Sequence, residues 1–162
     1  MITPAVQRAC AILLPRAILG FVYLFAGIHK LTDVGAMEFG QRMVALSDAT
    51  RFLPGGLVLA VGAVTPFLEL ALGLLLLIGL WTRPALRALA ALVVFITAAY
   101  GVDGLLHPVG ATAMSVGVVN TFILPRAALL FVTLLLPAED DLLSVDALIA
   151  SRSMSYRSTR LA

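Results

Sequence analysis

Residues 55–80 read GGLVLAVGAVTPFLELALGLLLLIGL, an apolar run in which Glu69 is the only charged residue. A helix needs about 20 mostly apolar residues to cross the hydrocarbon core of a bilayer. Inside that core every backbone polar group must be satisfied within its own element, which favours a helix over an open strand. The run therefore predicts a transmembrane helix that carries one carboxyl group.

Three further apolar stretches are long enough to cross a membrane: about Ala9–Ile28, Ala85–Val102 and Val116–Leu136. Arg16 lies inside the first of them and Arg126 near the centre of the last. The connections are short, so neighbouring helices should pack antiparallel. We therefore expect an all-α fold, an integral membrane four-helix bundle with antiparallel up-and-down topology.

One domain is expected over residues 1–143, followed by a basic cytoplasmic tail over residues 144–162 that is surface-bound or flexible. The composition fits a membrane protein, because 61% of the residues are hydrophobic and 12% are charged, against about 25% charged in soluble domains. This balance excludes a soluble enzyme domain. The sequence shows no basic stripe with interleaved aromatic residues, which excludes a nucleic-acid-binding module. Cys10 is the only cysteine, so an internal disulfide and a thiolate zinc site are excluded too.

The connection between the first two spans contains a segment, Ala36–Leu46, in which apolar residues repeat at helical spacing. The pattern is weak. It predicts either a short amphipathic helix on the membrane surface or an ordinary polar loop.

The Lys and Arg residues beside the predicted spans set the expected orientation, because basic flanks favour the cytoplasmic side. One side would hold Arg8, Arg83, Arg87 and the arginines of the tail, and the other Lys30, Arg42 and Arg51. The first side carries more basic residues, so both termini are expected in the cytoplasm.

Three charged residues lie well inside predicted spans, at a cost of about 2.5–3.5 kcal/mol each on membrane insertion, whereas Arg87 is close enough to the start of the third span to reach the head groups. At 1.5 Å per residue, Arg16, Glu69 and Arg126 would stand about 10, 16 and 15 Å from the cytoplasmic boundary. An arginine side chain can bridge the differences between these depths. We therefore expect the three side chains to meet in one buried cluster.

The helical faces agree with this expectation, since residues three, four and seven apart share one side of a helix. Small residues recur on these faces, and small residues let membrane helices approach closely. The face in the first span comprises Arg16, Gly20, Tyr23, Gly27 and Lys30, and the face in the second comprises Gly62, Pro66, Glu69 and Gly73. The third span contributes Thr97, Tyr100 and Gly104, and the fourth contributes Arg126 and Thr133.

Two interpretations of the cluster remain open. Glu69 can neutralise the arginines and fix the register of the helices, because buried ion pairs add little net stability. Alternatively, one carboxylate with two guanidinium groups leaves a positive pocket, suited to a quinone head group or a lipid phosphate. The candidate ligand-binding residues are Arg16, Glu69, Arg126, Tyr23 and Tyr100.

Other polar residues give weaker signals. His29 and Lys30 close the first span, and such a pair is more often an interfacial anchor than a ligand. His107 and Asp103 supply only two metal ligands, so no metal site is expected. No residue stands out as catalytic, and the sequence shows no haem ligand pair, flavin fingerprint or iron–sulfur cysteines. Any electron carrier is therefore expected to be a diffusible quinone or to belong to a partner.

Residues 15–31, PRAILGFVYLFAGIHKL, resemble the first helix of the DoxX family, in which an arginine, a glycine and a closing Gly-x-x-Lys-Leu recur. Residues 66–73, PFLELALG, with GLWTR at 79–83, are similar to the second helix and turn of that family. The last helix, in which Arg126 opens RAALLF, looks more like that of the related methylamine-utilisation protein MauE. The resemblance spans about residues 10–136.

This resemblance implies a four-helix integral membrane protein connected with redox chemistry, in the cytoplasmic (inner) membrane of a bacterium. DoxX-type proteins include small-subunit relatives of thiosulfate:quinone oxidoreductase, and MauE-type proteins assist disulfide or cofactor maturation. MauE-like relatives commonly carry Cys-x-Cys between the third and fourth helices, whereas residues 102–112 here read VDGLLHPVGAT. Thiol exchange by this chain is therefore not expected.

The expected function is that of a DoxX-like subunit associated with a membrane oxidoreductase assembly. Such a subunit would not be catalytic alone. It would anchor a partner protein in the lipid bilayer and contact quinone through the buried Arg/Glu cluster, with no cofactor of its own. The alternative is a structural or assembly protein without ligand chemistry. A solute carrier is less favoured, since no inverted repeat is evident.

Overall fold

The computed structural model describes residues 3–46, 50, 53–106, 123–137 and 141–151. Its elements in chain order are α1 (Pro4–His29), the short π-helical turn η1 (Lys30–Val34), α2 (Ala36–Leu46), α3 (Gly55–Ile78), α4 (Thr82–Leu106) and α6 (Leu124–Leu135). A further helical segment covers residues 145–151. The described residues form no strand, which confirms the predicted all-α class.

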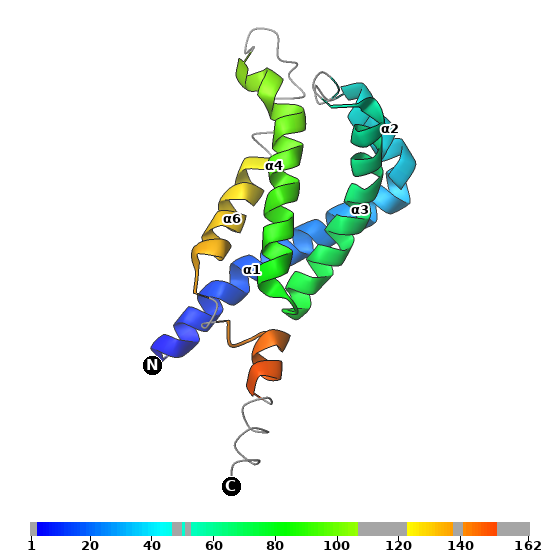
Figure 1. The fold of residues 1–162 in the computed structure, drawn as a ribbon. Helices are drawn as coiled ribbons and strands as arrows, with labels where there is room; N and C mark the ends of the chain where they lie inside the picture. Colours follow the sequence, from blue (N-terminus) through cyan, green and yellow to red (C-terminus); the bar gives the residue numbers. More distant parts are fainter. Residues whose placement is uncertain (1–2, 47–49, 51–52, 107–122, 138–140, 152–162) are drawn as a thin grey trace, which may run out of the picture.

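The long helices alternate in direction along the chain (Figure 1). In that view α1 rises obliquely from the N-terminus, α3 descends, α4 rises and α6 descends. α1 packs mainly against α3, while α6 contacts both α1 and α4. The regular four-helix bundle is not confirmed, because α6 has only 12 described residues and α1 runs obliquely.

α1 and α3 approach so closely that glycine is required where they cross. A Cβ atom added at Gly73 would lie 2.5 Å from the backbone nitrogen of Leu24. One added at Gly27 would lie 2.6 Å from the backbone nitrogen of Leu70. The small-residue faces predicted for the first two spans therefore form the interface between these helices.

α2 has the bounds predicted for the short segment between the first two spans, so the helix rather than the loop is confirmed. It packs on the first half of α3, where a Cβ atom at Gly62 would lie 2.7 Å from the Cα atom of Gly40. Met43 of α2 and Val58 of α3 are fully buried in this contact. The inner face of α2 is thus covered by α3.

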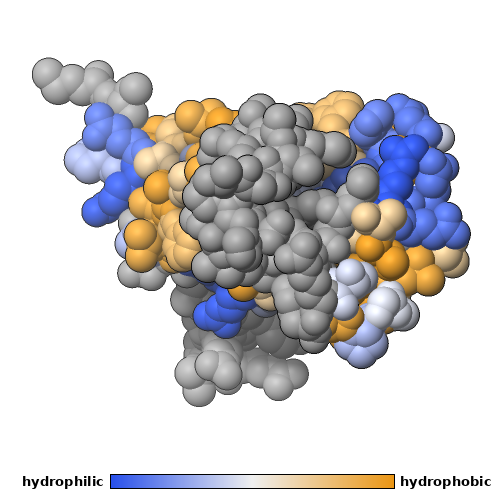
Figure 2. Space-filling model, turned by 90° about the horizontal axis from the view of Figure 1, so that it is seen from above, coloured by the Kyte–Doolittle hydropathy of each residue, from blue (hydrophilic) through white to orange (hydrophobic). Residues whose placement is uncertain are grey.

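The outer surfaces of the two longest apolar helices carry large hydrophobic side chains. Among the described residues, Val6–Val34 and Gly55–Ile78 are long and apolar enough to cross a membrane. Exposed hydrophobic residues on them include Leu14, Ile18, Phe21 and Phe25, and Val64, Phe67, Leu68 and Leu74. Figure 2 shows such hydrophobic surface beside hydrophilic groups gathered at the edges of the molecule. Large exposed apolar surface of this kind marks a membrane or protein contact.

The last two predicted spans differ from the described helices. α4 contains the predicted Ala85–Val102 and extends it at both ends. The described part of the last span begins at Ile123, α6 begins at Leu124, and residues 116–122 lie outside the described ranges. Pro125 therefore stands in the first turn of α6, where its missing N–H group costs nothing.

Candidate functional site

Glu69 lies in the middle of α3 and is almost completely buried, with 1% of its surface exposed. The ammonium group of Lys30, just beyond the end of α1, is 2.6 Å from both carboxylate oxygens of Glu69. The same ammonium lies 4.7 Å from the centre of the Phe39 ring of α2, a cation–π contact. Lys30 therefore joins α1, α2 and α3 at one point.

Tyr23 and Arg126 form a second contact close to the ion pair. The Arg126 guanidinium lies over the Tyr23 ring, 5.6 Å from its centre. Tyr23 is 1% exposed, and its hydroxyl has no hydrogen-bond partner in the described part of the chain. Glu69 and Arg126 both act electrostatically on Tyr23 and on Lys30. These four residues, Tyr23, Lys30, Glu69 and Arg126, are called the central cluster below.

Arg16 lies elsewhere, so the predicted single cluster is divided in two. Its Nη2 atom donates to the carbonyl oxygen of Leu143 at 2.7 Å, and Nη1 lies 3.5 Å from the Asp141 carboxylate. The guanidinium fills the space beside Gly79, just after the end of α3. Gly79 is ten residues beyond Glu69, or about 15 Å along a helix.

The separation has a simple physical cause. It is the register of α1 against α3: Gly27 lies against Pro66 and Leu70, and Gly20 against Gly73 and Leu77, so Arg16 is level with Gly79 at the end of α3. The long Arg16 side chain finds polar partners at that end of the molecule. Glu69 takes Lys30 instead, because this residue lies on the same face of α1 as Tyr23 and Gly27.

Tyr100 belongs to α4, but its side chain lies outside the described part of the structure. The weaker candidate His107 lies outside it as well. Within the described residues, no group of three or more His, Cys, Asp or Glu side chains could hold a metal ion.

Residues 141–151, called the C-terminal segment below, dock on the turn between α3 and α4. That turn contains two left-handed residues, Gly79 at φ 70° and Trp81 at φ 50°. The Asp146 carboxylate accepts hydrogen bonds from the backbone N–H groups of Trp81 and Thr82, each at 3.0 Å. Asp146 therefore caps the start of α4 and supports a backbone conformation that is uncommon for a residue other than glycine.

The C-terminal segment includes the start of the tail that was predicted, from Ser144 onward, to be surface-bound or flexible. Ser144 is buried, and the backbone N–H of Asp146 donates to the carbonyl oxygen of Gly79 at 3.1 Å. Partial burial raises the pKa of the Asp141 carboxyl above its ordinary value, although the positive charge of Arg16 opposes that rise. The segment is thus held by Arg16 on one side and by the start of α4 on the other.

Replacing Asp146 by alanine should loosen the C-terminal segment. The variant loses the cap of α4, at a cost of about 1 kcal/mol. We expect a lower melting temperature and faster cleavage by trypsin at the arginines that follow residue 151. Ser151→Ala is the matched control, because its exposed hydroxyl donates to the carbonyl oxygen of Leu148 within the segment. Equal cleavage rates for Asp146→Ala and the unaltered chain would contradict the docking contact.

Three functional partners were missed in the sequence. Lys30 was interpreted as an interfacial anchor, although its spacing from Tyr23 and Gly27 placed it on the inner face. Asp141 and Asp146 follow the last predicted span, where acidic residues carry little weight in topology rules. Their positions in the sequence gave no signal that they would pair with Arg16 and α4.

One family matches the chain: the model for methylamine utilisation protein MauE matches residues 8–107. The match begins in α1 and ends just beyond α4, so it includes Tyr23, Lys30 and Glu69. No curated protein and no solved structure matches the chain. The resemblance to MauE is therefore confirmed, whereas the assignment to DoxX stays a prediction. Since the match covers more than half of its residues, this chain belongs to the family of methylamine utilisation protein MauE, whose members are helical membrane proteins.

Proposed function

We propose that the chain is a membrane subunit of an oxidoreductase assembly, in which it anchors a partner protein and contacts a quinone at the central cluster. Membership in a family connected with methylamine utilisation supports a role in a redox-related system. The observation that carries the quinone contact is the buried Tyr23 hydroxyl, which lacks a hydrogen-bond partner in the described residues while Arg126 covers its ring.

The chemistry of this donor set fits a quinone. A quinone carbonyl oxygen accepts hydrogen bonds, and the Tyr23 hydroxyl is a free donor in an apolar setting. The Arg126 guanidinium beside the ring favours a carbonyl oxygen that gains negative charge on reduction. The quinone supplies the electron transfer, and the residues of this chain orient it.

The proposal includes four membrane crossings in the cytoplasmic membrane of a bacterium, with both termini in the cytoplasm. α4, at 25 residues, is long enough to cross a bilayer. The early part of α1, through Arg16, and the C-terminal segment lie at the same end of the molecule (Figure 1). An even number of crossings would produce that arrangement.

Tyr23→Phe is the sharpest test, because it removes one hydroxyl and keeps the ring under Arg126. The purified chain should be stabilised thermally by decylubiquinone, since a ligand that binds the folded state raises its melting temperature. The variant should fold as well as the unaltered chain but lose most of this shift, and quinone-coupled turnover in membranes should fall at least tenfold.

Thr65→Val is the matched control for this experiment. Thr65 is also fully buried, but its hydroxyl already donates to the carbonyl oxygen of Val61 at 2.8 Å. It should keep the response to decylubiquinone. A Tyr23→Phe chain that responds like the unaltered one would refute the quinone contact.

A structural or assembly protein is the second candidate. The ion pairs favour it, because their charged groups are already bonded within the chain. Both oxygens of Glu69 are taken by Lys30, and Arg16 is held by Asp141 and Leu143. Such pairs fix how helices fit together without binding a ligand. In that case Tyr23→Phe would leave turnover unchanged, while loss of Glu69 would lower the abundance of the assembly.

A further inference from the structure

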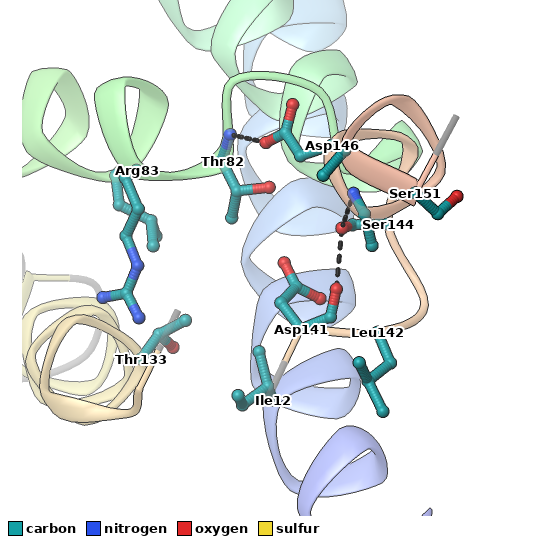
Figure 3. Close-up of a pocket in the computed structure, with 12 residues that line it drawn as sticks. Ile12, Thr82, Arg83, Thr133, Asp141, Leu142, Ser144, Asp146 and Ser151 are labelled. Atoms are coloured by element: carbon teal, nitrogen blue, oxygen red, sulfur yellow. Dashed lines mark hydrogen bonds between the residues drawn. The ribbon is translucent and has the colours of Figure 1, made fainter. Parts of the chain in front are cut away.

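The helix at residues 145–151 of the C-terminal segment turns its more polar side toward the rest of the chain. The residues that line the cavity between this helix and α1, α4 and α6 are Asp146, Ala147, Ala150 and Ser151. Figure 3 shows the Asp146 carboxylate on this side, where it accepts a hydrogen bond from the backbone N–H of Thr82. The contact that docks the helix is therefore polar.

The opposite side of the same helix is apolar. At about 3.6 residues per turn, Val145, Leu148 and Ile149 stand on the side away from the cavity. Leu148 is 63% exposed, Ile149 56%, and Leu143, just before the helix, 54%. A surface helix of a soluble domain has the reverse arrangement, with its apolar side on the core and its polar side in water. Leu143, Leu148 and Ile149, called the outer face below, therefore indicate a contact with a membrane or a partner.

The outer face belongs to a segment that is bonded to the chain where α3 ends. The backbone N–H of Asp146 donates to the carbonyl oxygen of Gly79, one residue beyond the end of α3 at Ile78. The Asp146 carboxylate also accepts from the backbone N–H of Trp81, whose side chain is 66% exposed. Tryptophan is enriched where membrane helices leave the hydrocarbon core and meet the head groups. This position favours the bilayer interface as the surroundings of the outer face.

The sequence after this helix carries positive charge. Residues 152–162 read RSMSYRSTRLA, with three arginines and no acidic residue. At the same end of the molecule, Arg8 of α1 and Arg87 of α4 are exposed. An anionic bilayer surface attracts basic residues, by about fivefold in binding constant for each one that lies near the head groups. Charge complementarity therefore favours anionic lipid as the partner of the outer face.

The acidic residues nearby weaken this attraction only in part. Asp141 is paired with Arg16, and Asp146 with the backbone N–H groups at the start of α4. Glu139 and Asp140 come before the segment in the sequence, whereas the three arginines come after it. The part of the chain that follows the outer face therefore keeps its positive charge.

We propose that the C-terminal segment lies in the interface of an anionic bilayer, with the outer face among the upper acyl chains and the arginines of residues 152–162 on the phosphate head groups. Apolar burial and attraction to anionic lipid add up in segments of this kind. Because Asp146 caps α4, lipid that holds the segment would also stabilise the turn between α3 and α4. None of the residues of the central cluster takes part, so the inference does not rest on the proposed quinone contact.

A fluorophore at residue 149 of the full chain tests the proposal. Cys10→Ala removes the only cysteine, and Ile149→Cys then carries the environment-sensitive dye NBD in lipid nanodiscs. The discs contain phosphatidylcholine alone or an equal mixture with phosphatidylglycerol, and a nitroxide on the upper acyl chain quenches a dye that lies in the interface. Quenching should be at least about threefold stronger in the mixed discs. The difference should disappear at about 1 M salt, where the Debye length falls to about 3 Å.

A dye at Gln41 is the matched control for position. Gln41 is uncharged and exposed on α2, near the opposite end of the molecule (Figure 1), and its dye should respond equally to both kinds of disc. Equal quenching of the dye at residue 149 in the two kinds of disc would overturn the proposal. Absence of quenching in both would overturn it too, and would leave the outer face to a protein partner.

Two variants separate the apolar contribution from the charged one. Leu148→Gln changes an exposed side chain that the fold does not bury, and it should reduce quenching in the mixed discs to the level of the neutral ones. Replacing Arg152, Arg157 and Arg160 by glutamine should abolish the difference between the discs. Arg42→Gln removes a cation that is paired with Glu38, and it should change nothing. If Leu148→Gln and the arginine variant both quench like the unaltered segment, the contact with anionic lipid is refuted.

Discussion

Glu69→Met should cost the folded chain about 3 kcal/mol of stability, the low end of the range for breaking a buried ion pair. The substitution keeps a side chain of similar length but leaves the Lys30 ammonium without its carboxylate. Only 19% of the Lys30 side chain is exposed, so water can compensate only in part. We expect low abundance in membranes and a clearly lower melting temperature in mild detergent.

The double variant Lys30→Met, Glu69→Met separates the charge from the packing. Replacing both members of a buried pair by apolar residues is often neutral or stabilising. The double variant should therefore recover most of the stability that Glu69→Met loses. Arg42→Met is the control for losing a cation, since its pair with Glu38 is more than half exposed and worth little. If Glu69→Met melts like the unaltered chain, the pair does not hold α1 to α3.

The helices and their contacting faces could be predicted from the sequence because they depend on local spacing. Gly20 and Gly27 share one face of α1, and Gly62 and Gly73 share one face of α3. A face of small residues predicts a close contact between helices, whatever the exact depth of each helix in the membrane. The burial of Arg16 and Glu69 followed from the same spacing. The all-helical class and the α1–α3 interface are the parts of the fold that this periodicity determines.

The choice of ionic partners could not be predicted in the same way. The partners depend on which residues of α1 and α3 stand opposite each other, and a change of five residues in that register shifts a side chain by about 7 Å. A long arginine or lysine side chain can then bridge to either of two layers. Asp141 became the partner of Arg16 only because the C-terminal segment folds back onto Gly79, a contact between residues 125 positions apart.

Gly73→Ala should weaken the contact between α1 and α3, although alanine is ordinarily the better helix former. In an open helix the change would gain up to about 1 kcal/mol. Here the added methyl group would stand 2.5 Å from the backbone nitrogen of Leu24 and 2.8 Å from the carbonyl oxygen of Gly20. Backbone atoms cannot turn aside as a flexible side chain does, so the helices must separate, at a net cost of about 1–3 kcal/mol.

Gly56→Ala makes the opposite outcome testable in the same helix. No atom lies within 4 Å of the position its Cβ would take, so only the gain in helix propensity remains. Thermal unfolding in one detergent should therefore rank Gly56→Ala at or above the unaltered chain and Gly73→Ala well below it. Separation at Gly73 would also shift Tyr23, one residue from Leu24, and with it the geometry under Arg126. Gly73→Ala should thus reduce the thermal stabilisation by decylubiquinone. Equal melting temperatures for Gly73→Ala and Gly56→Ala would mean that the close glycine contact does not hold α1 and α3 together.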